Sequence, residues 1–279
     1  MGTKSFNGKA IYNPKGKAGE YSEWACNFYN GCSNGCEYCY CKKGILAKTM
    51  GGNEPTLKKC FKNEEHALEV FKKELLSNIE QLKEHSLFFS FTTDPMLEDT
   101  YYLTMSAVNV CLANDVPVKI LTKCTRKVLS VFFGDSVYKD YYKSKKHLIA
   151  IGFTLTGHDE LEPHAPSNEE RIEVMKMLHD EGFKTFASIE PIIDFDSSLR
   201  MIERSAPYCS LFKIGLESGK RYFKRELLEF INNVNWIFED STKKIYFKDS
   251  LLQLAEIDRK NLGAHCVSRD YNLFKSDEV

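Results

Sequence analysis

Short apolar runs alternate along the chain with longer segments that carry apolar residues at helical spacing. The apolar runs are WACNF (24–28), LFFSF (87–91), VKILT (118–122), LIAIGFT (148–154), FASI (186–189) and SLFKIG (210–215). Runs of this length are typical of strands that are buried on both faces of a sheet. We therefore predict six strands.

Helix-length segments separate the predicted strands. The segment at 167–183 opens with Ser167 three residues before Glu170, which is a capping box, and it ends at Gly182, which is a helix-stop signal. Residues 66–84 place apolar side chains near one side of a helix. Further helices are predicted at 101–111, 128–142, 197–204 and 226–239.

Strands that alternate with helices imply right-handed βαβ units and a parallel sheet. Six such units between about 22 and 240 predict an α/β fold, a partial (β/α)6 barrel, with a flat doubly wound sheet as the alternative. We expect residues 1–240 to form this barrel with a basic N-terminal segment, and residues 241–279 to be a short C-terminal extension packed on it. In either fold, the chemistry is expected at the carboxyl ends of the strands.

The charged residues indicate possible binding surfaces only in local clusters. The 279 residues carry 38 basic and 39 acidic side chains, so the bulk charge indicates neither nucleic acid nor membrane as a partner. Two basic clusters stand out, at Lys4, Lys9, Lys15 and Lys17, and at Lys119, Lys123, Arg126 and Lys127. No apolar run reaches the roughly 18 residues of a membrane span. We expect a cytoplasmic protein with reduced thiols, so clustered cysteines favour metal binding or catalysis.

Five of the ten cysteines lie between Cys26 and Cys41. Cys32, Cys36 and Cys39 form a C-x3-C-x2-C motif in a segment rich in Gly and Asn, which can curl around a metal. Thiolates are ligands for iron–sulfur clusters and for zinc. A structural zinc site usually needs two separated pairs of ligands, and no second pair follows. Three ligands in one loop would leave one iron of a 4Fe-4S cluster open to a cofactor.

The motif CSNGCEYC, with Tyr38 as its aromatic residue, resembles the signature of the radical S-adenosylmethionine (SAM) enzymes. Together with WACNFYNGCSNGCEYCY, the blocks FSFTTDP, VKILTKCTR, EPHAPSNEERI and ASIEPIID resemble the spore photoproduct lyase and DNA repair photolyase-like subfamily, from about 24 to 216. The resemblance implies a 4Fe-4S cluster on Cys32, Cys36 and Cys39, with SAM on the fourth iron. Reductive cleavage of SAM would give a 5′-deoxyadenosyl radical that abstracts hydrogen from a substrate.

The methionyl end of SAM needs acceptors for its ammonium group and a cation for its carboxylate. The resemblance places Thr92, Thr93 and Asp94, at the end of the second strand, beside the ammonium, and Lys123 beside the carboxylate. A strand-end turn and a solvated lysine are the alternatives.

Arg171 is a second candidate cation. It falls in the first turn of a helix, where a cation is unfavourable, so an anionic partner is expected. That partner is SAM, Glu162 or Glu169.

Three further strand ends complete the expected cofactor site. From their positions at strand ends, Thr154 is expected to reach the ribose and Glu190 to bind a polar group of SAM or substrate. By resemblance, Ile214 and Gly215 contact adenine. Strand propensity, turn capping and core packing are the respective alternatives.

Two thiols near the motif are candidates for catalysis. Cys41 and Cys124 could donate hydrogen to a product radical or act as nucleophiles, although a free cysteine is commonly a small buried hydrophobic residue. Spore photoproduct lyase itself carries a donating cysteine at the position where this chain has Phe91. That difference puts thymine-dimer repair in doubt.

The expected function is therefore radical SAM chemistry on a nucleic acid or nucleotide, with DNA or RNA as a partner. Modification of a peptide or small metabolite is one alternative, and a non-catalytic zinc-binding nucleic-acid module is another. We also expect a flavodoxin- or ferredoxin-like one-electron donor, no membrane and a monomer.

Overall fold

The computed structural model describes residues 5–135, 137–239 and 241–275, so Lys4 of the basic N-terminal cluster lies outside the described residues. Its main sheet has eight strands, and β3 and β4 form a separate two-stranded antiparallel sheet. The strands are β1 (Ile11–Tyr12), β2 (Ala25–Cys26), β3 (Tyr29–Asn30), β4 (Thr56–Leu57), β5 (Leu87–Phe89), β6 (Val118–Thr122), β7 (Ile149–Thr154), β8 (Lys184–Ile192), β9 (Leu211–Leu216) and β10 (Lys244–Phe247).

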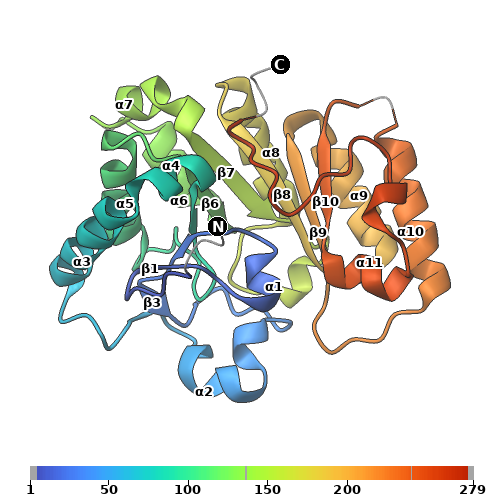
Figure 1. The fold of residues 1–279 in the computed structure, drawn as a ribbon, viewed down its shortest axis with the longest axis horizontal. Coiled ribbons are helices and arrows are strands. Elements are labelled where there is room, and N and C mark those ends of the chain that lie inside the picture. Colours follow the sequence, from blue (N-terminus) through green and yellow to red (C-terminus); the bar gives the residue numbers. More distant parts are fainter. Residues whose placement is uncertain (1–4, 136, 240, 276–279) are drawn as a thin grey trace.

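The strand order identifies the fold. Neighbours in the main sheet follow the order β1-β2-β5-β6-β7-β8-β9-β10, and every pair from β2 to β10 is parallel. A doubly wound sheet reverses its strand order part-way, and this sheet does not. The sheet curves with its helices on the outside (Figure 1). The predicted partial barrel is confirmed, and the flat sheet is not what forms.

Except for α1 and α2, the helices lie mainly on the outer side of the curved sheet (Figure 1). The helices are α1 (Gly16–Gly19), α2 (Ala47–Met50), α3 (Glu64–Ser77), α4 (Ile79–His85), α5 (Tyr101–Ala113), α6 (Thr125–Phe132), α7 (Lys139–Ser144), α8 (Asn168–Asp180), α9 (Phe195–Ser205), α10 (Lys224–Ile237) and α11 (Asp249–Ala255). Ser167 caps α8 by accepting from the Glu170 amide, as predicted. The predicted single helix at 66–84 divides at Asn78, and the one at 128–142 divides between α6 and α7.

The inner face of the sheet becomes polar toward the carboxyl ends of the strands. Alternate residues of a strand point to opposite faces, so the inner positions can be followed two residues at a time. Deep inside, an apolar cluster fills the barrel with side chains that include Phe88, Ala150, Phe186, Leu211 and Tyr246. Further along the same inner face come Lys123, Thr154, Ser188, Glu190 and Lys248, which line a cavity. The sheet therefore supplies a mainly apolar floor, in which Lys213 is also buried, and a polar mouth.

The C-terminal segment belongs to this sheet. Strand β10 pairs in parallel with β9, in register from Lys244 opposite Leu211 to Phe247 opposite Ile214. Beyond it, the chain crosses the inner side of the sheet (red in Figure 1), and the Asn272 side chain donates to the carbonyl of Glu84. The segment predicted as an extension thus adds a strand and helps to close the barrel. Among the helices of the described residues, none is both long and apolar enough to cross a membrane.

Candidate active site

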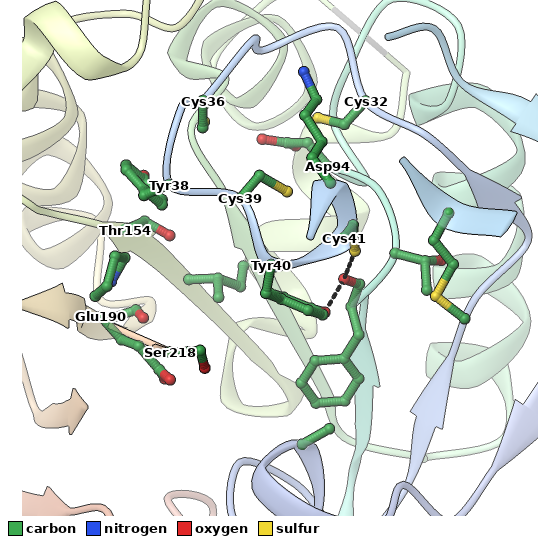
Figure 2. Close-up of a pocket in the computed structure, with 18 of the residues that line it drawn as sticks. Cys32, Cys36, Tyr38, Cys39, Tyr40, Cys41, Asp94, Thr154, Glu190 and Ser218 are labelled. Atoms are coloured by element: carbon green, nitrogen blue, oxygen red, sulfur yellow. Dashed lines mark hydrogen bonds between the residues drawn. The ribbon is translucent and has the colours of Figure 1, made fainter. Parts of the chain in front are cut away.

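A cavity of about 650 Å³ lies at the carboxyl ends of the parallel strands. The cysteine loop forms one wall, and the ends of β7, β8 and β9 form the opposite wall. Figure 2 shows Cys32, Cys36 and Cys39 along the loop, Asp94 beside Cys32, and Thr154, Glu190 and Ser218 across the space. Eleven of the fifteen predicted site residues line this cavity, namely Cys32, Cys36, Tyr38, Cys39, Cys41, Thr92, Thr93, Asp94, Lys123, Thr154 and Glu190. Gly215 lies next to Glu190 but does not line it.

Backbone hydrogen bonds hold the cysteine loop in its curve. The Cys32 amide donates to the carbonyl of Gly52 at 3.1 Å, and the Glu37 amide donates to that of Leu161 at 3.0 Å. Gly35 adopts a φ of 73°, and a Cβ there would lie 2.9 Å from the His164 ring. Only glycine combines that conformation with so close an approach. The loop is therefore shaped by its neighbours before any metal binds.

The three motif cysteines fit an iron–sulfur cluster. They bring three thiols from one loop to one cavity. Thiolates are the ligands of a 4Fe-4S cluster, and each of them binds a different iron. Three thiols from one loop therefore supply the donor set of a cluster in which one iron has no protein ligand.

The motif thiols differ in acidity. Burial raises the pKa of Cys32 to about 11 and also raises that of Cys36. A hydrogen bond from Cys41 instead lowers the pKa of Cys39 to about 6. Because metal ligands must be thiolates, binding of a cluster would release protons from the two buried cysteines.

Asp94 joins the cysteine loop to the end of β6. Its carboxylate accepts from the Asn34 side chain at 2.9 Å, the Met96 amide at 3.0 Å, the Thr122 hydroxyl at 2.6 Å and the Lys123 amide at 2.8 Å. A carboxylate has about four acceptor sites, so these donors fill it. Asp94 thus positions the loop, its predicted contact with the SAM ammonium group stays a prediction, and a neighbouring residue offers an unpaired hydroxyl to the cavity.

Thr93 is that neighbour. Its hydroxyl is buried, lines the cavity and has no hydrogen-bond partner within the described residues. Thr92, in contrast, donates its hydroxyl to the carbonyl of Tyr29 at 2.5 Å. An unpaired buried hydroxyl is costly unless a ligand satisfies it. Thr93 is thus the member of the TTD block that is free to bind a polar group of SAM.

Substitutions can distinguish the role of Thr93 from the role of Asp94. We expect Thr93→Val to leave the stability of the apoprotein unchanged, because no internal hydrogen bond is lost, while the Kd for SAM rises about tenfold or more. Asp94→Asn turns an amide group toward hydrogen-bond donors and should destabilise the apoprotein by about 2–3 kcal/mol. Urea denaturation and equilibrium dialysis with SAM measure the two effects. If the Asp94→Asn protein were stable but no longer bound SAM, Asp94 and not Thr93 would be the residue that contacts the ammonium group.

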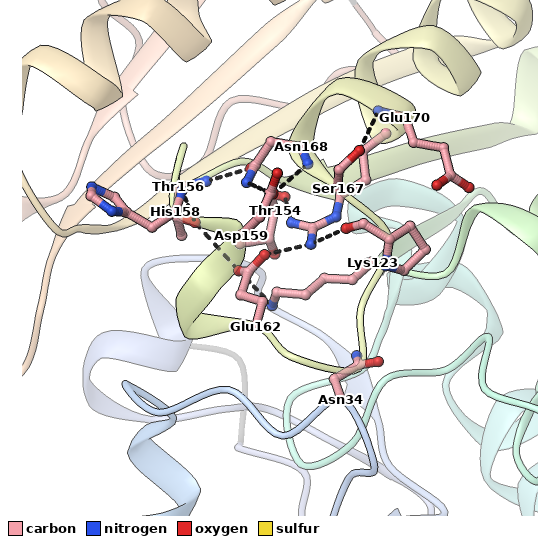
Figure 3. Close-up of polar contacts among 12 residues, drawn as sticks. Asn34, Lys123, Thr154, Thr156, His158, Asp159, Glu162, Ser167, Asn168 and Glu170 are labelled. Atoms are coloured by element: carbon pink, nitrogen blue, oxygen red, sulfur yellow. Dashed lines mark hydrogen bonds and ion pairs between the residues drawn. The ribbon is translucent and has the colours of Figure 1, made fainter.

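Glu162 organises a buried polar network on the other side of the loop (Figure 3). Its side chain is about 1% exposed and pairs with Arg171, which is fully buried. The Tyr38 hydroxyl donates to the same carboxylate, and the Lys123 ammonium lies 3.9 Å from it. Arg171 also donates to the carbonyl of Thr154 at 2.9 Å. Of the three partners left open by the sequence, Glu162 is the one observed, and Arg171 does not line the cavity.

Lys123 remains a candidate for binding the SAM carboxylate. Its side chain is largely buried, lines the cavity and lies over the Tyr38 ring, 5.6 Å from the ring centroid. Burial opposes its charged form, but Tyr38, Cys36 and Glu162 together raise its pKa well above the usual range. Lys123 is therefore a stable cation beside the cysteine loop.

The far wall contains a residue that sequence reasoning missed. Lys248, just beyond β10, is buried and donates to Glu190 at 2.8 Å. A Cβ at Gly215 would lie 2.8 Å from the Cδ atoms of both Glu190 and Lys248, so the glycine leaves room for this pair. Ile214 points to the outer face and packs in the core, and Leu216 lines the cavity instead. The only available signal for Lys248 was its position at the end of the apolar run KIYF.

The two candidate catalytic thiols lie in different places. Cys41 lines the cavity, with its Sγ atom 3.9 Å from the carbonyl oxygen of Phe91. Cys124 does not line it, and its Sγ lies 3.9 Å from the side-chain oxygen of Asn34. Burial raises the pKa of Cys124, so it is a neutral thiol behind the loop. Cys41 thus lies in the cavity wall and Cys124 beside the loop, and a catalytic role for either thiol stays a prediction.

Comparison with known proteins agrees with this site. The family described as the radical SAM superfamily matches residues 26–206, which is more than half of the chain. The chain belongs to the radical SAM superfamily. Membership makes it an enzyme and implies a 4Fe-4S cluster and SAM as its cofactors. The rival hypothesis of a non-catalytic zinc module is thereby set aside.

This radical SAM protein is similar to one curated protein and to two crystal structures of another protein. An uncharacterized protein of Methanocaldococcus jannaschii, MJ0683, is 26% identical over 247 residues, covering 76% of this chain and 86% of the relative. The crystal structures of Streptococcus suis SuiB, alone and bound to SAM, have TM-scores of 0.47 and 0.49 and identities of 12% and 11%. They align with 71% and 84% of this chain. The aligned part is about half of each SuiB chain, 47% and 50%.

Proposed function

We propose that this radical SAM enzyme acts on a nucleic acid or a nucleotide, as a relative of spore photoproduct lyase. When bound, the cluster and SAM supply a 5′-deoxyadenosyl radical, by one-electron reductive cleavage, that abstracts hydrogen from the substrate. The single observation that carries the substrate class is the mouth of the cavity, where Lys17 and Lys42 lie with Tyr40. Lysines pair with phosphates, and aromatic rings stack on bases.

The cofactors have assigned positions in this proposal. Cys32, Cys36 and Cys39 ligate the cluster, while Thr93 and Lys123 bind the amino and carboxylate groups of SAM. The support for this assignment is the unpaired hydroxyl of Thr93 and the stable charge of Lys123, both in the wall beside the thiols.

The remaining wall faces the nucleoside part of SAM. In the proposal, Thr154 and Glu190 bind ribose or substrate hydroxyl groups, and adenine lies against the end of β9 at Gly215 and Leu216. Glu190 supports this role because one of its oxygens pairs with Lys248 and the side chain is still 24% exposed to the cavity.

Cys41 is proposed as the hydrogen donor to the product radical. Spore photoproduct lyase itself has a donating cysteine where this chain has Phe91, and the Cys41 sulfur lies beside the Phe91 backbone. The closeness of this thiol to the backbone of the residue that replaces the donating cysteine supports the proposal. Cys41→Ala should leave SAM cleavage intact and should allow the substrate radical to give side products.

Binding to single-stranded oligonucleotides tests the substrate class. We expect DNA or RNA binding that weakens with salt, because phosphate contacts release counterions. Lys17→Ala with Lys42→Ala should weaken binding about tenfold and reduce the salt slope by about 2. Fluorescence anisotropy measures both, and Lys72→Ala with Lys260→Ala is the matched control.

Absence of binding at low salt would contradict the nucleic-acid proposal and favour the alternative, a peptide or small metabolite. In the favoured proposal the protein is a cytoplasmic monomer, and a flavodoxin- or ferredoxin-like protein supplies the electron. DNA or RNA is the substrate partner.

A further inference from the structure

A second, smaller hollow lies behind the cysteine loop. It has a volume of about 240 Å³, and Lys48, Lys58 and Lys59 are among the residues that line it. Its lining includes no acidic side chain. The hollow is lined by residues of the two-stranded β3–β4 sheet and of α2, which lies at the lower edge of Figure 1. It is thus a cationic surface feature outside the cavity that holds the thiols.

Only backbone separates this hollow from the cysteine loop. Gly52 lines both the hollow and the main cavity, and its carbonyl accepts from the Cys32 amide at 3.1 Å. Gly31, the residue before Cys32, also lines the hollow. A Cβ at Gly31 would lie 2.3 Å from the carbonyl oxygen of Glu54, so no side chain fits between the two spaces. One hydrogen bond therefore connects the cationic surface to a proposed cluster ligand.

The surface around the hollow is rich in unneutralised lysines. Residues 38–62 contain six lysines and one acidic residue, Glu54. The Lys58 ammonium bonds to the carbonyl of Asn27 at 3.2 Å. Lys48 and Lys59 are exposed, and neither has an ion pair with any acid in the described ranges. The same loop exposes Ile45, which is 88% accessible. Two free cations and an exposed apolar side chain are typical of a surface that receives an acidic partner.

We propose that this face is the docking site of the electron donor, an acidic protein that carries a one-electron flavin or iron–sulfur group. The inference rests on the proposed function, since it concerns the reductive step of that chemistry. In that step the donor is oxidised by one electron, the enzyme's iron–sulfur group is reduced by one electron, and no bond to the donor forms. Lys48 and Lys59 hold the donor against the hollow, where the hydrogen bond between Cys32 and Gly52 leads inward to the cysteine loop.

The test is a double charge reversal, Lys48→Glu with Lys59→Glu, in the reconstituted enzyme. The probe is a reduced bacterial flavodoxin, and its Kd is measured by biolayer interferometry at low and moderate salt. We expect the Kd to rise about tenfold at low salt and the wild-type affinity to fall with added salt. SAM cleavage driven by flavodoxin, its reductase and NADPH should fall by a similar factor. Cleavage driven by dithionite should be unchanged.

The matched control is Lys72→Glu with Lys260→Glu, which removes two exposed lysines elsewhere and should leave the flavodoxin Kd unchanged. An unaltered Kd in the Lys48 and Lys59 variant would overturn the proposal. A loss of oligonucleotide binding with full flavodoxin affinity would also overturn it and assign this face to the substrate. If the wild-type enzyme cleaved no SAM with either reductant, the proposed function would fail, while the Kd comparison would still decide the docking site.

Discussion

Cys36→Ala is expected to abolish SAM cleavage and to remove the visible absorbance of the reconstituted cluster. Cys36 is one of the three motif thiols that line the cavity, and Cys41 is the only other cysteine of the described residues that lines it. A 4Fe-4S cluster with only two protein ligands and an open iron is poorly retained. Anaerobic reconstitution with iron and sulfide, followed by iron analysis and quantification of 5′-deoxyadenosine, measures the loss. We expect 5′-deoxyadenosine to fall to background.

Cys60→Ala is the control, because Cys60 is an exposed free cysteine outside the cavity lining. It should keep full iron content and SAM cleavage. Cluster absorbance retained by Cys36→Ala would refute the ligand assignment. In that case Cys41, the cavity cysteine nearest the motif, is the next ligand to test by a double substitution.

Glu162→Gln is expected to give the largest loss of stability among the site substitutions, about 3 kcal/mol. Arg171 and Glu162 are fully or almost fully buried, so loss of the carboxylate charge leaves the guanidinium uncompensated away from water. Tyr38 and Lys123 also lose their anionic partner. The urea midpoint of the apoprotein should fall while the m-value stays constant. Measurement without iron keeps cluster binding out of the comparison.

Glu169→Gln is the matched control. Glu169 pairs with Arg204, but both side chains are about half exposed, so loss of the pair should change stability by less than about 0.5 kcal/mol. Equal midpoints for the two variants would show that the buried network does not stabilise the fold. Arg171→Met should behave like Glu162→Gln, and the double variant should lose less than the sum of the two.

The Cys36 and Glu162 substitutions test two different contributions to the same site. Cys36 tests the group that binds the cofactor, whereas Glu162 tests the network that positions Tyr38, Lys123 and the carbonyl of Thr154 around it. We expect Glu162→Gln to reduce cluster occupancy only in proportion to the unfolded or distorted fraction. The Cys36 variant should instead be as stable as the wild-type apoprotein.

The sequence by itself determined the local parts of this protein. Short apolar runs separated by helical segments specify strands and helices, because a buried parallel strand must be apolar on both faces. The spacing of Cys32, Cys36 and Cys39 predicted one loop that carries three thiols, since residues this near in sequence need no tertiary information to lie close. Residues at strand ends were also predictable, because parallel strands place their carboxyl ends at one edge of the sheet.

Only the tertiary structure decided which side chains remain free to act. Asp94 was predicted beside the ammonium group of SAM, and its carboxylate accepts hydrogen bonds from Asn34 and Lys123, which come from other elements. Arg171 was predicted to have an anionic partner, and it pairs with Glu162. Lys248 lies in the site because β10 extends the sheet. Its partner Glu190 is 58 residues away in the sequence. Hydrogen-bond satisfaction and burial depend on contacts between distant segments, and a linear pattern does not contain them.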